Sequence, residues 1–407
     1  MRDRHPPSSP AHVPATRATR QRGRSHGAAG FTIIELLVAV VIGLTLTLAV
    51  TGMMTRHERD RRSVASTNDV ALGSASVSYL LDRTIRSAGS GFAQAWDQSA
   101  GCVLRVARSG SLILPRSNAF PEPFDSLPTA AQTPRLMPLL VHAGAGVGGT
   151  DVIAVLSGAS GLGEAPLRVL PNSSAGNSLR LASTVGLRGD DLILVLEEGV
   201  GCVVQQITSS FTGGATQLIS TGGAYAKDPV DNLAMASFSV GTSSAGAQVA
   251  VLGNASGNRP QFQLLGVGVN NTLFSYDLLQ LDGTDDPVPV AEGVLDLRAL
   301  YGVDSDNNGL VDTWVAPSVD GWKAADLSTG TAAASTKLRQ ILALRVGMVL
   351  RTDRYEKENV SPETLTLFSD LPTAVHHTRT LSLDERQLRT RAVEFTVPLR
   401  NTMLVAR

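Results

Sequence analysis

The chain contains little of what a thiolate metal site or a nucleic-acid-binding surface requires. Only 2 of its 407 residues are cysteine, and no cluster of other ligating side chains accompanies them, so we expect no metal site built on thiolates. The formal net charge is -1, and the residues after position 30 are acidic on balance. We therefore expect no nucleic-acid partner.

Signatures of enzyme active sites are absent or incomplete. After His57, the chain has Arg61 where a zinc protease needs its second histidine, and no G-x-S-x-G nucleophile elbow occurs. Residues 144–149 match G-x-G-x-x-G, but a strand-like run follows where a dinucleotide-binding helix should begin. His376 and His377 have no cysteine or acidic cluster beside them, so we interpret them as solvated loop residues. The chain is therefore expected to be non-catalytic.

One long apolar run is present near the N-terminus. Residues 31–54 form this run, and Glu35 is the only charged residue in it. A helix of this length extends about 36 Å at 1.5 Å per residue, which exceeds the roughly 30 Å of a membrane's hydrocarbon core. A secretory signal peptide would be cleaved after its apolar core, whereas in this chain the candidate cleavage residue, Gly30, precedes the apolar run. We expect a transmembrane helix that stays in the mature protein.

Glu35 is the most unusual residue of the predicted transmembrane helix. A charged side chain there costs about 3 kcal/mol on insertion scales unless it is paired, so such residues usually have a function. We expect Glu35 to pair with a cation from another subunit. The alternative is an incidental glutamate close to the membrane interface.

Charges on the two sides of the run predict its orientation. Six arginines oppose one aspartate in residues 1–30, whereas four arginines oppose two acids in residues 56–62. Because the cytoplasmic side usually carries the larger excess of Lys and Arg, the N-terminus is predicted to be cytoplasmic.

The helix is expected to continue beyond the membrane. Residues 55–88 contain no proline, and their apolar side chains recur in steps of seven and four, which is typical of one stripe on an amphipathic helix. The stripe consists of Val70, Val77, Leu81 and Ile85. We predict that it docks on a β-sheet.

From residue 89 to residue 407, short β-like runs alternate with Gly, Ser, Pro and Asn. The predicted fold class is α+β, with the long N-terminal helix packed on a large antiparallel β-rich domain. Residues 237–260 are poor in charge and rich in Gly, Ala and Ser, so they either connect two β subdomains or form a long excursion from one sheet. Pro398 places the last predicted strand at a sheet edge or at its own end. The predicted strands are 151–156, 191–196, 202–208, 262–269, 341–350 and 392–399.

The segment 304–312 could bind calcium. Its oxygen-bearing side chains occupy the first, third, fifth and ninth positions of an EF-hand-like loop, and glycine is sixth. The twelfth position is Val315 instead of a bidentate glutamate, and the flanks have the alternation of strands. A hairpin loop whose acids bind only their own backbone is therefore the alternative. The possible ligands are Asp304, Asp306, Asn308, Asp312 and the carbonyl of Leu310.

The Gly30-Phe31 junction, Glu35 and the following apolar run resemble the type IV prepilin signature. The resemblance implies that prepilin peptidase cuts between Gly30 and Phe31 and methylates the new N-terminal Phe31. It also implies that Glu35 pairs with the Phe31 amine of another subunit as the helices bundle. The chain then divides into a leader, 1–30, a transmembrane helix, 31–54, its amphipathic continuation, 55–88, and a periplasmic β-rich domain, 89–407.

Three later segments, 290–314, 350–352 and 395–401, are similar to the PilW family of minor pilins. This resemblance implies a pilin-like fold and a subunit that helps to initiate assembly of a type IV pilus and could sit at its tip. It implies partners as well: prepilin peptidase, other minor and major pilins, the inner-membrane assembly platform and membrane lipid. The protein would be stored in the inner membrane and later reach the cell surface in the pilus, or fimbrium. Alternative functions are a minor pseudopilin of a type II secretion system and a pilus-borne adhesin.

The predicted periplasmic location bears on the two cysteines. The periplasm is oxidising, so a disulfide between Cys102 and Cys202 is the leading interpretation. Two separate buried thiols are the alternative, because the sequence does not establish that the two residues lie close together.

Overall fold

The computed structural model describes residues 30–159, 165–170, 177–197, 201–213, 217–226 and 246–403. The chain divides into two compact units, Met1–Arg62 and Ser63–Arg407. Leader residues 1–29 and the first part of the stretch 237–260, up to residue 245, lie outside the described residues.

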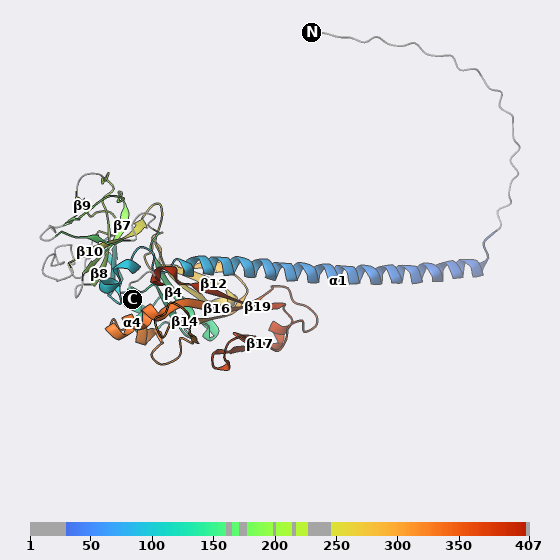
Figure 1. Ribbon diagram of the computed structural model, residues 1–407. Coiled ribbons are helices and arrows are strands. Elements are labelled where there is room, and N and C mark those ends of the chain that lie inside the picture. Colours follow the sequence, from blue (N-terminus) through green and yellow to red (C-terminus); the bar gives the residue numbers. More distant parts are fainter. Residues whose placement is uncertain are drawn as a thin grey trace, which may run out of the picture. The chain divides into compact units, whose positions relative to one another are not determined.

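Helix α1, Ile33–Arg86, is the long blue helix in Figure 1. Its part in the first unit contains Ile33–Glu58, which is long and apolar enough to cross a membrane, and no residue of its most apolar window is buried. The threonine hydroxyls of this segment donate to backbone carbonyls three or four positions earlier. For example, Thr45 donates to Ile42 at 2.9 Å and Thr51 donates to Thr47 at 2.7 Å. These bonds satisfy the hydroxyls within the helix, as a hydrocarbon environment requires.

The part of α1 in the second unit is amphipathic, as predicted. The stripe residues Val70, Val77, Leu81 and Ile85 are all buried. Beyond the end of the helix, the amide of Gly89 donates to the carbonyl of Leu156 at 2.8 Å. The carbonyls of Ser87 and Ala88 accept from the side-chain amide of Asn401, at 3.2 and 2.9 Å. A residue near the C-terminus thus satisfies carbonyl groups just after α1.

The described strands form three larger sheets and two strand pairs, and the neighbouring strands are antiparallel except for the parallel pair β1 and β8. The six-stranded sheet has the order β2-β1-β8-β7-β10-β5, with β1 Leu104–Arg108, β2 Ser111–Leu114, β5 Leu167–Arg168, β7 Asp191–Glu197, β8 Gly201–Gln206 and β10 Gln248–Asn254. The five-stranded sheet has the order β13-β12-β11-β4-β3, with β3 Leu139–His142, β4 Val152–Ser157, β11 Gln261–Val267, β12 Leu273–Asp277 and β13 Val288–Ala291.

The four-stranded sheet has the order β15-β14-β16-β19, with β14 Val294–Val303, β15 Thr313–Val315, β16 Ile341–Arg351 and β19 Thr390–Pro398. The two pairs are β6 Ser178–Arg180 with β9 Leu218–Ser220, and β17 Thr364–Leu367 with β18 His377–Thr380. The short helices are α2 Trp96–Ser99, α3 Ala324–Leu327, α4 Ala332–Gln340, α5 Leu383–Arg386 and α6 Arg400–Met403, and the 3-10 turns are η1 Ala93–Ala95, η2 Thr129–Gln132, η3 Val147–Gly149, η5 Val269–Asn271 and η6 Thr373–Val375.

The six predicted strands are confirmed as β4, β7, β8, β11, β16 and β19, and β19 lies at a sheet edge as Pro398 indicated. The interpretation of 237–260 as a connection is wrong for its second half, because β10 lies there. The small residues Ala250 and Gly253 conceal a strand whose Val249 and Leu252 are fully buried. The small, uncharged residues of this segment suggested a loop, but in a sheet whose two faces are both buried the same composition is compatible with a strand.

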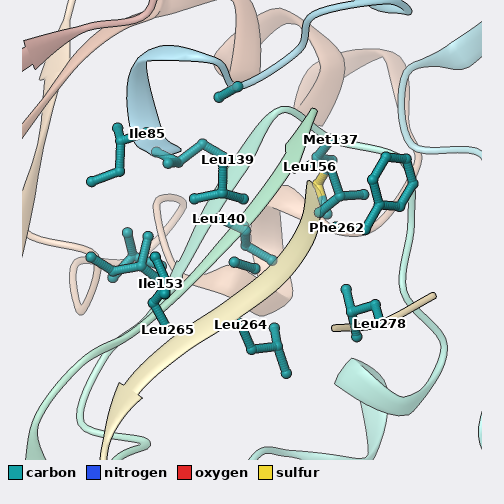
Figure 2. Close-up of a cluster of buried hydrophobic side chains, with 14 of the residues drawn as sticks. Ile85, Met137, Leu139, Leu140, Ile153, Leu156, Phe262, Leu264, Leu265 and Leu278 are labelled. Atoms are coloured by element: carbon teal, nitrogen blue, oxygen red, sulfur yellow. The ribbon is translucent and has the colours of Figure 1, made fainter. Parts of the chain in front are cut away.

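The main hydrophobic core receives side chains from α1 and from all three larger sheets. Figure 2 shows its centre around β3, β4 and β11, where Ile85 lies on the same side as Leu139, Ile153 and Leu265. Leu140, Leu264 and Leu278 lie on the other side of these strands. All six residues of β4 are buried, because both faces of this sheet are covered.

Candidate functional site

The predicted cleavage junction lies just before the first turn of α1. Gly30, Phe31 and Thr32 precede the helix, which begins at Ile33, and the side chain of Phe31 is 81% exposed. The backbone here is not part of a helix or a strand, so the bond between Gly30 and Phe31 is accessible. A peptidase can thus bind this segment without first breaking a helix.

Glu35 lies in the first turn of α1 and is exposed. Its amide donates to the Thr32 carbonyl at 3.0 Å and makes a longer bond, 3.4 Å, to the Thr32 hydroxyl. The Thr32 hydroxyl thus accepts from the first turn of the helix, as an N-cap side chain does, and a negative charge is favourable at a helix N-terminus. The sequence interpretation missed this local role, although Thr32 signals it. Pairing between Glu35 and the Phe31 amine of another subunit stays a prediction.

Cys102 and Cys202 are joined in a disulfide, with their Cα atoms 5.8 Å apart, as predicted. The bond links Cys102, two positions before β1, to Cys202 in β8, which pairs with Leu104 in the parallel ladder. It closes a loop of 100 positions in sequence. The disulfide therefore fixes two adjacent central strands of the six-stranded sheet.

The Asp/Asn loop, residues 304–312, connects β14 to β15 and forms the hairpin predicted from its flanks. Carboxylate oxygens of Asp304, Asp306 and Asp312 all lie within 4.8 Å of one another. Asp304 is buried, whereas the other two aspartates are exposed. The structure thus brings together three of the predicted calcium ligands.

The same oxygens also bind the backbone of their own loop. Asp304 accepts hydrogen bonds from the amides of Asn308 and Gly309, at 3.0 and 2.8 Å, and the Asn308 side chain accepts from the Leu310 amide at 2.8 Å. The hydroxyl and amide of Ser305 donate to Asp312 and hold the pKa of that carboxyl below its usual value. Calcium binding stays a prediction, because these contacts suit the self-capping alternative equally well.

A buried charge network lies on the same sheet. Asp296, in β14, is fully buried, accepts a hydrogen bond from Arg298 at 2.9 Å and lies 2.8 Å from Nε2 of His377 in β18. Burial opposes ionisation of Asp296, but the hydrogen bond with His377 and the charge of Arg298 together hold its pKa below the usual value. The network attaches the β17–β18 pair to the four-stranded sheet.

The interpretation of His376 and His377 as solvated loop residues is wrong for His377, whereas His376 does lie in a loop and is partly exposed. His377 begins β18 and contacts Asp296, whereas His376 lies 2.7 Å from the Leu371 carbonyl through Nε2. Sequence reasoning missed the pair because 81 positions separate Asp296 from His377. No local pattern encodes such a long-range contact.

Comparison with known families gives two matches. Residues 253–401 match the PilW family, described as type IV pilus-assembly protein W, and residues 25–51 match the prokaryotic N-terminal methylation motif. No curated protein and no solved structure matches the chain significantly. The first match contains the whole four-stranded sheet with the Asp/Asn loop and the Asp296 network, and the second contains Gly30, Phe31 and Glu35.

Proposed function

We propose that this chain, which is similar to PilW-type type IV pilins, acts as a minor pilin that helps to initiate assembly of a type IV pilus. One observation carries the proposal: a methylation motif and a PilW region occur on the same chain, at opposite ends of it. In this role the protein is non-catalytic. It is first a substrate of prepilin peptidase and then a structural subunit.

The membrane helix supplies the first step. Ile33–Glu58 is apolar enough to hold the protein in the inner membrane. The N-terminus would face the cytoplasm, where the peptidase removes the leader and methylates Phe31, and the second unit would lie in the periplasm. Storage in the membrane keeps the subunit next to the assembly platform until a pilus begins.

Glu35 supplies the second step. Cutting after Gly30 creates an amine on Phe31, and a cation is the partner that a lone carboxylate in hydrocarbon needs. An ion pair between Glu35 of one subunit and the Phe31 amine of its neighbour neutralises both charges as the subunit leaves the bilayer. The other pilins of the initiating complex are its expected partners.

Replacing Glu35 tests this step. We expect Glu35→Gln to be inserted and cut normally, because a neutral side chain eases membrane residence. Recovery of partner pilins after purification of the chain from membranes should fall about tenfold. Asp69→Asn is the matched control, since Asp69 is an exposed carboxylate on the same helix outside the membrane segment, and it should leave recovery unchanged.

The identity of the recovered proteins decides between the possible assemblies. Recovery of type IV pilus pilins would support the proposal, whereas recovery of pseudopilins would show that the protein belongs to a type II secretion system instead. If Glu35→Gln recovers partners as well as the wild type does, the proposed ion pair is contradicted.

A further inference from the structure

The second unit contains a mostly apolar cavity of about 80 Å³. Its floor is one face of the five-stranded sheet, including Leu140 of β3, Ala154 of β4 and Leu264 of β11. Its rim comes from η2 and its flanking residues and from α3. Rim residues Ala130 and Ala325 are exposed, so the cavity has access to solvent.

Strand register explains why the cavity exists. Ala154 pairs directly with Leu140 on one side and with Leu264 on the other. Directly opposed residues of antiparallel strands share one face, so these three side chains form one row. The small methyl group of Ala154 between two leucines leaves the space open, and Figure 2 shows Leu140, Leu264 and Leu278 on this side of the sheet.

His142 gives the cavity a polar group. It follows Leu140 by two positions in β3 and so lies on the same face. It lines the cavity, is only 8% exposed, and its Nδ1 has no hydrogen-bond partner in the described part of the chain. Burial lowers the pKa of His142 to about 4, so the ring is neutral at neutral pH. A buried polar atom without a hydrogen-bond partner destabilises a protein, and a ligand that pairs with it recovers part of that loss.

The volume limits the size of a ligand. One water occupies about 30 Å³ of liquid, and an engineered apolar cavity of about 150 Å³ binds benzene. By the measure that gives 80 Å³, one water needs only about 10–15 Å³. The present cavity is about half the size of the one that binds benzene, so a single small ring fits only if part of it extends out through the open rim. Arg135 also lines the cavity, but its guanidinium donates to the Gly101 carbonyl at 2.6 Å.

We propose that this cavity binds a small uncharged molecule with an apolar ring and one hydroxyl group, whose hydroxyl pairs with His142. A hydroxyl both donates and accepts, so it can satisfy either nitrogen of a neutral imidazole. The apolar floor formed by Leu140, Ala154 and Leu264 favours the ring and disfavours a charge.

Phenol and toluene are the probes, because they differ only by a hydroxyl in place of a methyl group. Binding is measured on the full chain in detergent micelles from the methyl NMR shifts of Leu140 and Leu264 during titration. We expect phenol to bind at least fivefold more tightly than toluene, and the order to reverse in His142→Phe, which keeps a ring but has no nitrogen.

A second variant separates the cavity from partition into the micelle. Ala154→Leu fills the floor and should abolish the saturable shifts, whereas Ala392→Leu, on exposed edge strand β19, should leave them unchanged. The proposal would be overturned if toluene bound the wild type more tightly than phenol does. It would also be overturned if benzoate, a charged ring of similar size, bound more tightly than phenol, or if phenol caused the same shifts in Ala154→Leu as in the wild type. If His142→Phe does not fold, the wild-type order and the Ala154→Leu result decide the question.

Discussion

The four-stranded and six-stranded sheets of the second unit are stabilised in different ways. Strands β14 and β16 have 10 and 11 residues and pair over most of their length. In the six-stranded sheet no strand exceeds seven residues, and its strands come from positions between 104 and 254. The first sheet lies wholly within the PilW match, whereas the second lies almost wholly outside it.

Both sheets contain hairpins of consecutive strands, β14–β15 in the four-stranded sheet and β1–β2 and β7–β8 in the six-stranded sheet. They differ in how their other strands are held together. The six-stranded sheet brings β1 beside β8 in a parallel ladder and adds the Cys102–Cys202 disulfide there. We infer that the residues matched by the PilW family build the sheet with long continuous strand pairing. The six-stranded sheet depends instead on a covalent link between distant segments.

Removing the disulfide should give the largest effect. Cys102→Ser with Cys202→Ser frees a loop of 100 positions, and the chain-entropy account assigns about 4.7 kcal/mol of stability to such a link. We expect hydrogen exchange to show lost protection in β1, β7 and β8, with β14 and β16 still protected. Equal loss in both sheets would show that they unfold as one unit and that the comparison is wrong.

A change in the Asp296 network should have an intermediate effect on the opposite sheet. Asp296→Asn removes a buried carboxylate that binds Arg298 and His377, and bonds to charged groups contribute about 2 kcal/mol. Protection should fall in β14, β17 and β18 and persist in β8, the reverse of the cysteine variant.

The pH dependence of the same variant sharpens this prediction. Because the pKa of Asp296 in the folded protein lies below 3.8, its ionised form contributes stability above about pH 4, and this contribution is lost as the pH falls through the lowered pKa. Asparagine does not titrate. The free energy of unfolding should therefore fall less steeply in Asp296→Asn than in the wild type between about pH 5 and pH 2; identical slopes would contradict the assigned network.

Calcium should give the smallest effect, confined to the Asp/Asn loop. The missing twelfth-position glutamate predicts a dissociation constant near the millimolar range, and at that concentration a bound ion stabilises by about 0.4 kcal/mol. The melting temperature of the full chain should rise slightly in several millimolar calcium and return in chelator. Asp304→Asn with Asp306→Asn should remove the response, and a wild-type protein indifferent to calcium would favour the self-capping loop.

The sequence predicted features that repeat locally. The stripe from Val70 to Ile85 and the alternation around β19 depend on side-chain period alone, so they were readable without a structure. With only two cysteines, a single intramolecular pairing was possible. Contacts such as Asp296 with His377 could not be predicted from the sequence, and neither could the placement of His142 and Ala154 in one cavity, because each depends on which strands become neighbours.

The most direct test of the account is the N-terminus of the protein recovered from membranes. Intact mass and N-terminal peptide mapping should show a chain that begins at methylated Phe31. Gly30→Val should accumulate at its full 407 residues, because the peptidase has to accommodate a residue with almost no side chain beside the cut bond. A wild-type chain that keeps residues 1–30, or a Gly30→Val chain trimmed normally to Phe31, would contradict the assignment of this protein as a processed type IV pilin.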